Sequence, residues 1–151
     1  MRIKLMRKSS KAPTIKTEGS VGYDCYLDLG YMVEEGKEIP PVVMLAPGQK
    51  AKLGLGFASE VPQPYAGLVL PRSGTGSDGI HLANLVAVID RDYRGEWICN
   101  IHNTTDDRVT LKHGERYFQM VIVQVYTNPL VIVDELSDTA RGAGGFGSTG
   151  K

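Results

Sequence analysis

Residues 84 to 97 read Asn-Leu-Val-Ala-Val-Ile-Asp-Arg-Asp-Tyr-Arg-Gly-Glu-Trp. The apolar, β-branched run breaks into a charged turn and then resumes as a strand, a pattern that predicts a β-hairpin. We expect Leu85, Val86, Val88 and Ile89 to hold the first arm in a core, so that Asp90 stands on a rigid support at the mouth of a sheet. A carboxylate in that position suits a general base. The alternative interpretation is an Asp that only closes a turn.

The bulk composition restricts the class of protein. A length of 151 residues suits one domain. Lys and Arg together number 17, as do Asp and Glu, so the net charge is zero and no field for binding a polyanion is implied. We therefore expect no nucleic-acid partner. A negatively charged ligand must be held by a few placed cations and backbone donors.

The cysteines and the hydropathy pattern indicate the compartment. Cys25 and Cys99 are the two thiols, and the chain has neither a secretory n-region nor an apolar run of about 18 residues. These features predict a soluble cytoplasmic protein with free thiols and no membrane partner. No His lies at metal-ligand spacing from either cysteine, which favours buried structural thiols over a zinc site or a disulfide.

Short apolar segments with period two recur along the chain, separated by many of its 18 Gly and 8 Pro residues. This pattern favours an all-β fold. Besides the hairpin, we expect strands at 2–6, 23–29, 51–57, 68–70, 97–102, 109–111, 117–125 and 131–133. About ten short strands predict a double-sheet jelly roll or a distorted β-barrel, because both leave few free edges.

The C-terminal end differs in composition from the rest of the chain. We expect a β domain over residues 1–140 and a flexible, Gly-rich arm over residues 141–151. The arm could close over a nucleotide, with Arg141 on phosphate, Phe146 on a base, and Ser148 and Thr149 on oxygens. A disordered end is the alternative.

A donor-rich loop follows the short apolar run at 68–70. It reads Pro71-Arg72-Ser73-Gly74 and continues with Thr-Gly-Ser. Glycines allow backbone N–H groups to turn toward one point, and the Arg72 guanidinium matches phosphate oxygens. We interpret the loop as a phosphate site, with an ordinary Ser/Gly surface loop as the alternative.

Two further polar side chains are candidates. Gln119 lies within the most apolar run of the chain, where an unpaired amide would cost about 1 to 3 kcal/mol, so it needs a backbone, ligand or water partner. Asp24, on the polar face of an early strand, could hold a hydrated cation, because Mg²⁺ keeps several waters and reaches protein through one or two carboxylates. A solvated surface Asp is the alternative.

Five segments together resemble the trimeric dUTP pyrophosphatases (dUTPases), in the order of that family's motifs. They span residues 21 to 149 and read Val21-Gly-Tyr-Asp24, Pro71-Arg-Ser-Gly74, Asn84 through Asp90 with Tyr93-Arg-Gly-Glu96, Gly114-Glu-Arg116 with Gln119, and Arg141-Gly-Ala-Gly-Gly-Phe-Gly-Ser-Thr149. The resemblance implies a jelly-roll subunit of a homotrimer that shares its active sites between subunits. It also implies Mg²⁺-dependent hydrolysis of dUTP to dUMP and pyrophosphate.

The resemblance also implies roles for single residues. Asp90 deprotonates the water that attacks the α-phosphorus, Gln119 lies near that phosphate, and Asp24 contacts metal-bound water. Tyr93 lies against the deoxyribose. At the uracil edge, the implied contacts are Asn84 and backbone groups of the hairpin, including those of Ala87 and Ile89. At the phosphates they are Arg72, Ser73 and Gly74. The arm of another subunit contributes Arg141, Phe146, Gly147, Ser148 and Thr149. Such positioning and charge neutralisation are what phosphoryl transfer needs from a protein.

Two rival functions stay open at this point. The sibling dCTP deaminases share the fold, but their catalytic Glu aligns here with Asn100, so a deaminase would lack its acid/base. A binding or regulatory protein is the second rival, because a fold does not fix a function. Ala87 stands where the dUTPase family often has Gly, close to the expected uracil pocket.

Overall fold

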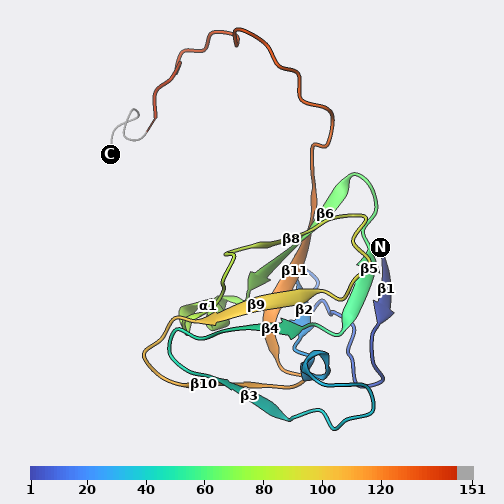
Figure 1. Cartoon of the computed structure of the whole chain (residues 1–151). Helices are drawn as coiled ribbons and strands as arrows, with labels where there is room; N and C mark the ends of the chain where they lie inside the picture. Colours follow the sequence, from blue (N-terminus) through green and yellow to red (C-terminus); the bar gives the residue numbers. More distant parts are fainter. Residues whose placement is uncertain (146–151) are drawn as a thin grey trace.

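The computed structural model describes residues 1–145. It is built almost wholly from strands, as the sequence predicts (Figure 1). They are β1 (Arg2–Leu5), β2 (Tyr23–Tyr26), β3 (Val42–Leu45), β4 (Lys50–Gly54), β5 (Phe57–Glu60), β6 (Tyr65–Pro71), β7 (Ile80–Leu82), β8 (Ala87–Ile89), β9 (Ile98–Asn103), β10 (Val109–Lys112) and β11 (Arg116–Gln124). The two short helical elements are the 3-10 turn η1 (Leu29–Met32) and α1 (Ser73–Ser77).

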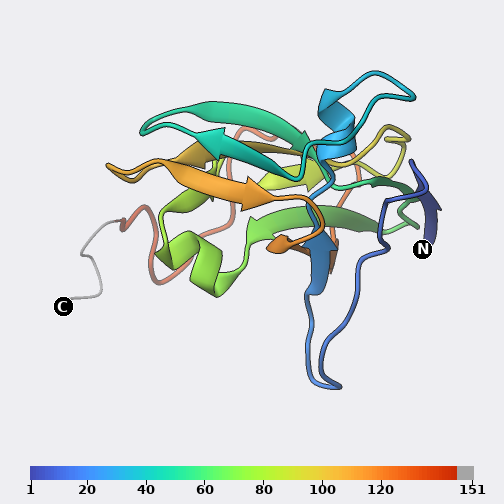
Figure 2. The ribbon, with the colours of Figure 1, turned by 90° about the horizontal axis from the view of Figure 1, so that it is seen from below.

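The strands form antiparallel sheets. The largest has the order β2-β11-β6-β8, and a second has the order β4-β9-β7. Two-stranded pairs β1-β5 and β3-β10 complete the architecture. The loop that precedes β2, blue in Figure 2, projects from the body of the molecule. The fold is therefore the expected all-β jelly roll, with connections that pass repeatedly between sheets.

The core between the sheets is dominated by aromatic and aliphatic side chains. Trp97 is fully buried and packs against Phe57, with ring centroids 5.1 Å apart. The Trp97 indole N–H donates to Ser59 Oγ at 3.1 Å, so its one polar atom is satisfied. Both cysteines are buried and free, which confirms the interpretation of structural thiols.

The expected hairpin at residues 84–97 is not formed. β8 pairs with β6, whereas β9 pairs with β4 and β7 in the other sheet. The charged segment at 90–97 is thus a loop between two sheets, and we call it the 90–97 loop. Sequence pattern predicted the two strands correctly, but local pattern carries no information about which distant strand supplies the hydrogen bonds.

The orientation of the first arm also differs from the expectation. Ile89 is buried, but Leu85 is 80% exposed, Val88 is 63% exposed and Val86 is 37% exposed. Besides Ile89, Ala87 is the other buried residue of β8. Because alternate residues of a strand point to opposite faces, Ala87 and Ile89 face the core and Val88 cannot. Exposed apolar side chains therefore lie beside Asp90.

Several expected strands change in extent. β1 forms, but its residues are exposed rather than buried on one face. The strand expected at 51–57 is interrupted at Gly56, which has a φ of +75°. Residues 131–133 form no strand: the segment after β11 runs away from the body, and no strand among residues 1–145 pairs with it (Figure 1). Within residues 1–145, no helix is long and apolar enough to cross a membrane.

Candidate active site

A polar cleft of about 580 Å³ lies where β2, β11 and the start of α1 meet. Three cationic side chains and one carboxylate line it, so the cleft favours an anion. Its lining residues are Lys16, Gly19, Ser20, Val21, Gly22, Asp24, Arg72, Ser73, Arg116 and Gln119. The structure thus brings together four residues that sequence analysis selected from three separate segments: Asp24, Arg72, Ser73 and Gln119.

Asp24 organises the cations of the cleft. Its Oδ1 lies 2.9 Å from Arg72 Nε, and its Oδ2 accepts a hydrogen bond from Arg116 Nη1 at 2.7 Å. Arg72 also donates through Nη1 to the Arg116 carbonyl at 3.1 Å. The alternative interpretation of Asp24 as a solvated surface residue is therefore wrong, because Asp24 is only 8% exposed. A buried carboxylate needs such partners, and here they hold both guanidinium groups at the cleft.

Gln119 has the partner that its position requires. β11 is a central strand, and Gln119 lies opposite Asp24 on β2 and Leu70 on β6. Its amide donates through Nε2 to the Pro71 carbonyl at 3.2 Å. Gly22 makes room for the amide, because a Cβ at that position would overlap Gln119 Oε1. The side chain is thus fixed at the wall of the cleft.

The expected phosphate loop is a short helical turn. Arg72 occupies the N-cap position of α1, with extended backbone angles and no side-chain capping bond. Ser73 and Gly74 form the first turn, where backbone N–H groups have no acceptor within the helix. These donors directly follow Arg72 in the chain, and Arg72 and Ser73 both line the cleft. The turn therefore supplies the backbone and side-chain donors that the sequence predicted, in a different backbone conformation.

Asp90 lies in a different cavity, of about 320 Å³, with an acidic and aromatic lining. The residues around it are Tyr65, Ala66, Asp90, Arg91, Asp92, Val125 and Thr127. Asp90 is exposed at the end of β8, and its carbonyl accepts from Tyr93 N at 3.2 Å. The Tyr93 hydroxyl donates to the Glu96 carbonyl at 2.9 Å. Asp90 is thus an accessible carboxylate next to an oriented aromatic ring.

The segment before β8 has an unusual backbone. Leu85 has a φ of +64°, and Val86 N donates to the Asn84 carbonyl at 2.7 Å, which makes a tight turn. A non-glycine residue in this region is strained, and such strain is concentrated at functional sites. Asn84 is exposed, whereas Ala87 and Ile89 are buried in the core. Ala87 and Ile89 can therefore contact a ligand only through their backbone atoms.

The cleft and the Asp90 cavity are far apart. Ile89 pairs with Gly67 near one end of β6, whereas Arg72 follows the other end. At about 3.3 Å per residue, roughly 17 Å of strand separates Arg72 from Asp90. Figure 1 shows α1 at the end of β6 opposite the chain that leaves β8. A general base must reach its proton within about 3 Å or through one water, so Asp90 cannot serve the cleft of its own chain.

The C-terminal arm contributes to neither cavity within the described chain. Arg141 is exposed, and its Nε donates to the Gly144 carbonyl at 2.9 Å. The expected ligand contacts of Phe146, Gly147, Ser148 and Thr149 lie outside the described residues. The segment that leads to the arm exposes apolar side chains, among which Ile132 is 98% exposed.

Sequence reasoning missed three contributors to the site. Arg116 appeared only as part of a motif, but its pairing with Asp24 across two strands makes it a cation of the cleft. Lys16 comes from the loop before β2, for which no periodic signal exists. Gly22 matters through its contact with Gln119. A motif shows which residue types recur together, but these contacts depend on the strand register.

A divalent cation would find one carboxylate in the cleft. Among residues 1–145, no group of three or more His, Cys, Asp or Glu side chains is arranged to hold a metal. Asp24 lies in the cleft, with both oxygens paired to arginines. This donor set fits an ion that a phosphate ligand carries and that reaches the protein through water, which is the usual habit of Mg²⁺.

Comparison with known proteins finds dUTPases both by sequence and by structure. The family model described as dUTPase matches residues 8–150. The deoxyuridine 5'-triphosphate nucleotidohydrolase of Hahella chejuensis is 43% identical over 140 residues, or 91% of this chain and 86% of that protein. The corresponding protein of Paraburkholderia xenovorans is 42% identical over 147 residues, or 96% of this chain and 93% of that protein.

A solved structure is similar over nearly the full length. The Staphylococcus bacteriophage 80alpha dUTPase with dUPNHPP has a TM-score of 0.84 and 27% sequence identity, and the match covers 99% of this chain and 98% of that chain. The matched region includes both the cleft around Asp24 and the loop that carries Asp90.

Proposed function

The chain belongs to the dUTPase family, and from this premise we propose that it hydrolyses dUTP to dUMP and pyrophosphate at sites shared between copies of the chain. One observation carries the proposal. The anion cleft combines three cations and one carboxylate, whereas the exposed carboxylate suited to activate water lies at the other end of β6. The chain thus has both a cationic cleft for phosphates and a carboxylate for activating water, but within one chain the carboxylate does not reach the cleft.

The cleft suits the triphosphate. Arg72 and Arg116 are held by Asp24 with N–H groups left for oxygens of a ligand, and Lys16 adds a third positive charge. The first-turn donors of Ser73 and Gly74 complete the set. Preorganised donors and cations are what stabilise the charge that develops on a transferring phosphoryl group.

Asp90 is the proposed general base. Its carboxylate orients and deprotonates a water for attack on the α-phosphorus, and the pyrophosphate leaves on the opposite side. Gln119, fixed by the Pro71 carbonyl, lies near the α-phosphate and the attacking water. The exposure of Asp90 at the end of a supported strand favours this role, because the base must meet a water that another copy's cleft presents.

The segment from Asn84 to Tyr93, which includes β8, binds the uracil and the sugar. Asn84 and the backbone groups of Ala87 and Ile89 meet the uracil edge, and the strained turn at Leu85 gives that backbone a fixed shape. Tyr93 lies against the deoxyribose, where its ring leaves no room for a 2′-hydroxyl. The hydrogen bond from Tyr93 to Glu96 supports a fixed position for this ring.

Mg²⁺ is the proposed cofactor. Asp24 would hold it through metal-bound water, together with the phosphates of the substrate. When bound, the ion neutralises part of the triphosphate charge and orients the phosphate chain. The chain's own arginines keep the same phosphates in the cleft.

A homotrimer is the proposed assembly. Two features support shared sites. The first is the roughly 17 Å between Arg72 and Asp90 within one chain, at about 3.3 Å per residue. The second is exposed apolar surface, both at Leu85 and Val88 beside the uracil segment and along the chain after β11. Closed cyclic symmetry lets each copy give Asp90 to one neighbour, and each arm brings Arg141, Phe146, Gly147, Ser148 and Thr149 to a site of another copy.

In the cell, the proposed reaction limits uracil incorporation into DNA and supplies dUMP for dTMP synthesis. The neutral net charge supports a free nucleotide rather than a nucleic acid as the partner. A cytoplasmic location agrees with the free, buried thiols.

The test is pyrophosphate release with Mg²⁺ from dUTP, dCTP, dTTP and UTP in parallel, with ammonia followed in the dCTP sample. We expect release from dUTP alone. Ammonia from dCTP would replace the proposal with a deaminase, and no reaction with any of the four nucleotides would replace it with a binding function.

A further inference from the structure

The 90–97 loop is held largely by side chains. Tyr93 N donates to the Asp90 carbonyl, and the next backbone hydrogen bond along the loop is that of Trp97 N to Phe57 O at 2.8 Å. Between these two points, the path of the chain depends on the side chains of Tyr93, Arg94 and Glu96. Because the loop carries both Asp90 and Tyr93, whatever fixes it also fixes two proposed contacts with the substrate.

Glu96 ties the end of the loop to a part-buried ion network. Its carboxylate is 8% exposed, forms an ion pair with Arg7 Nη2, and accepts from Gly56 N at 2.9 Å. Arg7 also donates through Nε to Asp28 Oδ2 at 3.1 Å. Burial alone would lower the pKa of the Arg7 guanidinium, but its bonds to Glu96 and Asp28 raise that pKa above its ordinary value. Glu96 is thus held by a part-buried ion pair and by a backbone N–H group.

Glu96 in turn fixes Tyr93. The Tyr93 hydroxyl donates to the Glu96 carbonyl at 2.9 Å, which folds the ring back over Gly95. A Cβ at position 95 would overlap the Tyr93 ring, so the ring lies directly on the backbone of Gly95. The position of the ring therefore follows from the position of Glu96, whose own carboxylate is held by the core.

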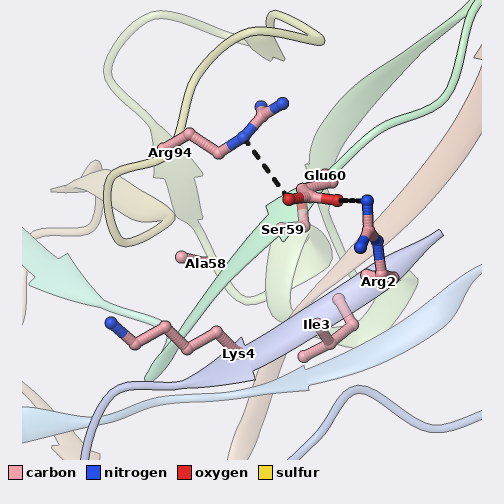
Figure 3. Close-up of a pocket in the computed structure, with 7 residues that line it drawn as sticks. All are labelled: Arg2, Ile3, Lys4, Ala58, Ser59, Glu60 and Arg94. Carbon is pink, nitrogen blue, oxygen red and sulfur yellow. Dashed lines mark ion pairs between the residues drawn. The ribbon is translucent and has the colours of Figure 1, made fainter.

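Arg94 supports the outer side of the same loop (Figure 3). Its Nη1 donates to the carbonyls of Arg91 at 2.6 Å and Tyr93 at 3.1 Å. Its Nε lies 4.0 Å from Glu60 on β5, and Glu60 pairs with Arg2 on β1 at 2.5 Å. These groups are exposed, so their contribution is smaller than that of the part-buried Arg7–Glu96 pair.

From this chain of contacts we propose that Glu96, anchored by Arg7, is a positioning residue that sets the Tyr93 ring against the sugar and so determines the preference for deoxyribonucleotides over ribonucleotides. The inference rests on the proposed function. A ring displaced by about 1 Å would lose its fit to the deoxyribose and would admit a 2′-hydroxyl, and misplacements of that size cost up to about 10²-fold in rate.

The test compares two matched carboxylate-to-amide substitutions in one ion network. Glu96→Gln removes the charge that anchors the loop, whereas Asp28→Asn removes the other carboxylate partner of Arg7 and touches no residue of the loop. For each variant, kcat/KM is measured with dUTP and with UTP. We expect Glu96→Gln to reduce the dUTP/UTP ratio on the order of 10-fold. Asp28→Asn should lower the midpoint of thermal unfolding but leave the ratio unchanged.

Tyr93→Phe keeps the ring and removes the hydrogen bond to Glu96, so it tests the same link without touching the buried charges. We expect Tyr93→Phe to lower the ratio of kcat/KM for dUTP to kcat/KM for UTP as much as Glu96→Gln does. The double variant should show no further loss, because both changes act on the same contact between Tyr93 and residue 96. An unchanged ratio in either single variant, or additive losses in the double variant, would overturn the inference. Absence of dUTP hydrolysis by the unaltered protein would instead refute the proposed function, and the inference with it.

Discussion

Asp90 and Arg72 are separated by nearly the full length of β6, although the proposed reaction needs both within a few ångströms of one substrate. The separation is built into the register, because β8 runs antiparallel along the middle of β6, so that Asp90 lies toward the beginning of β6, whereas α1 follows its end. No side-chain rotation can close a gap of roughly 17 Å along a strand. The proposed reaction therefore needs the Asp90 of one copy at the Arg72 cleft of another copy.

Asp90→Asn should remove the base without disturbing the fold. Asp90 is exposed and belongs to no ion pair among the described residues, so the amide should leave assembly and nucleotide binding intact. We expect turnover of dUTP to fall about 10²- to 10⁴-fold, as is usual for the loss of a general base. Steady-state kinetics with calorimetry of dUMP binding measures both quantities. Near-normal turnover would exclude Asp90 as the base.

Gly22→Ala should disturb Gln119. The new Cβ would overlap the Gln119 amide, so the bond to the Pro71 carbonyl would break and the amide would leave the wall of the cleft. We expect turnover to fall on the order of 10-fold, because misplaced groups lose much of their effect. Gly19→Ala is the matched control, since Gly19 lines the same cleft but its Cβ would have no neighbour within 4 Å. Equal losses in both variants would contradict a role for the Gln119 position.

Deletion of residues 141–151 should spare folding and impair catalysis. The described part of this segment is exposed, and Arg141 bonds only within it, so its removal should take little from the core. We expect an unchanged midpoint of thermal unfolding and a large loss of kcat/KM with dUTP, because the site would no longer close over the nucleotide. An unchanged rate would reduce the arm to a chain end with no function.

The thiols should resist alkylation in the folded protein. Burial raises the pKa of Cys25 from 9.0 to about 12 and that of Cys99 well above 9.0, so little thiolate exists at pH 8. The raised values favour the folded state below pH 9, and this contribution is lost as the pH rises from 9 toward 12. Thiol titration with and without urea at pH 8, and urea unfolding across that pH range, test both statements. Rapid labelling without urea would show that the core is open.

The fold class could be predicted from sequence because period-two alternation and frequent turn residues are local signals. The pairing of β8 with β6 could not, because hydrogen-bond partners lie far away in sequence. The exposure of Leu85 and Val88 was missed for a related reason: an apolar strand does not show which molecule covers its face. The absent strand at 131–133 has a similar cause, since the described part of the chain offers it no strand to pair with.

The site could be predicted in parts. Asp24, Arg72, Ser73 and Gln119 line one cleft, and it was the resemblance to the dUTPase family, not the residue types alone, that grouped them. The cation pair of Arg72 and Arg116 around Asp24, and the anchor from Arg7 to Glu96, depend on register and on contacts across sheets that no motif spacing encodes. The division of the site between two ends of β6 is invisible in a single sequence, which does not record its own symmetry.

Subunit complementation tests the shared site most directly. Asp90→Asn and Arg72→Met chains, each inactive alone, are co-expressed with different affinity tags, and assemblies that carry both tags are purified. Each mixed trimer then contains one interface that joins an intact Arg72 to an intact Asp90, so we expect about one third of the unaltered turnover of dUTP. Assemblies that carry both tags but show no activity would mean that Asp90 and Arg72 must act within one chain, and would contradict the account.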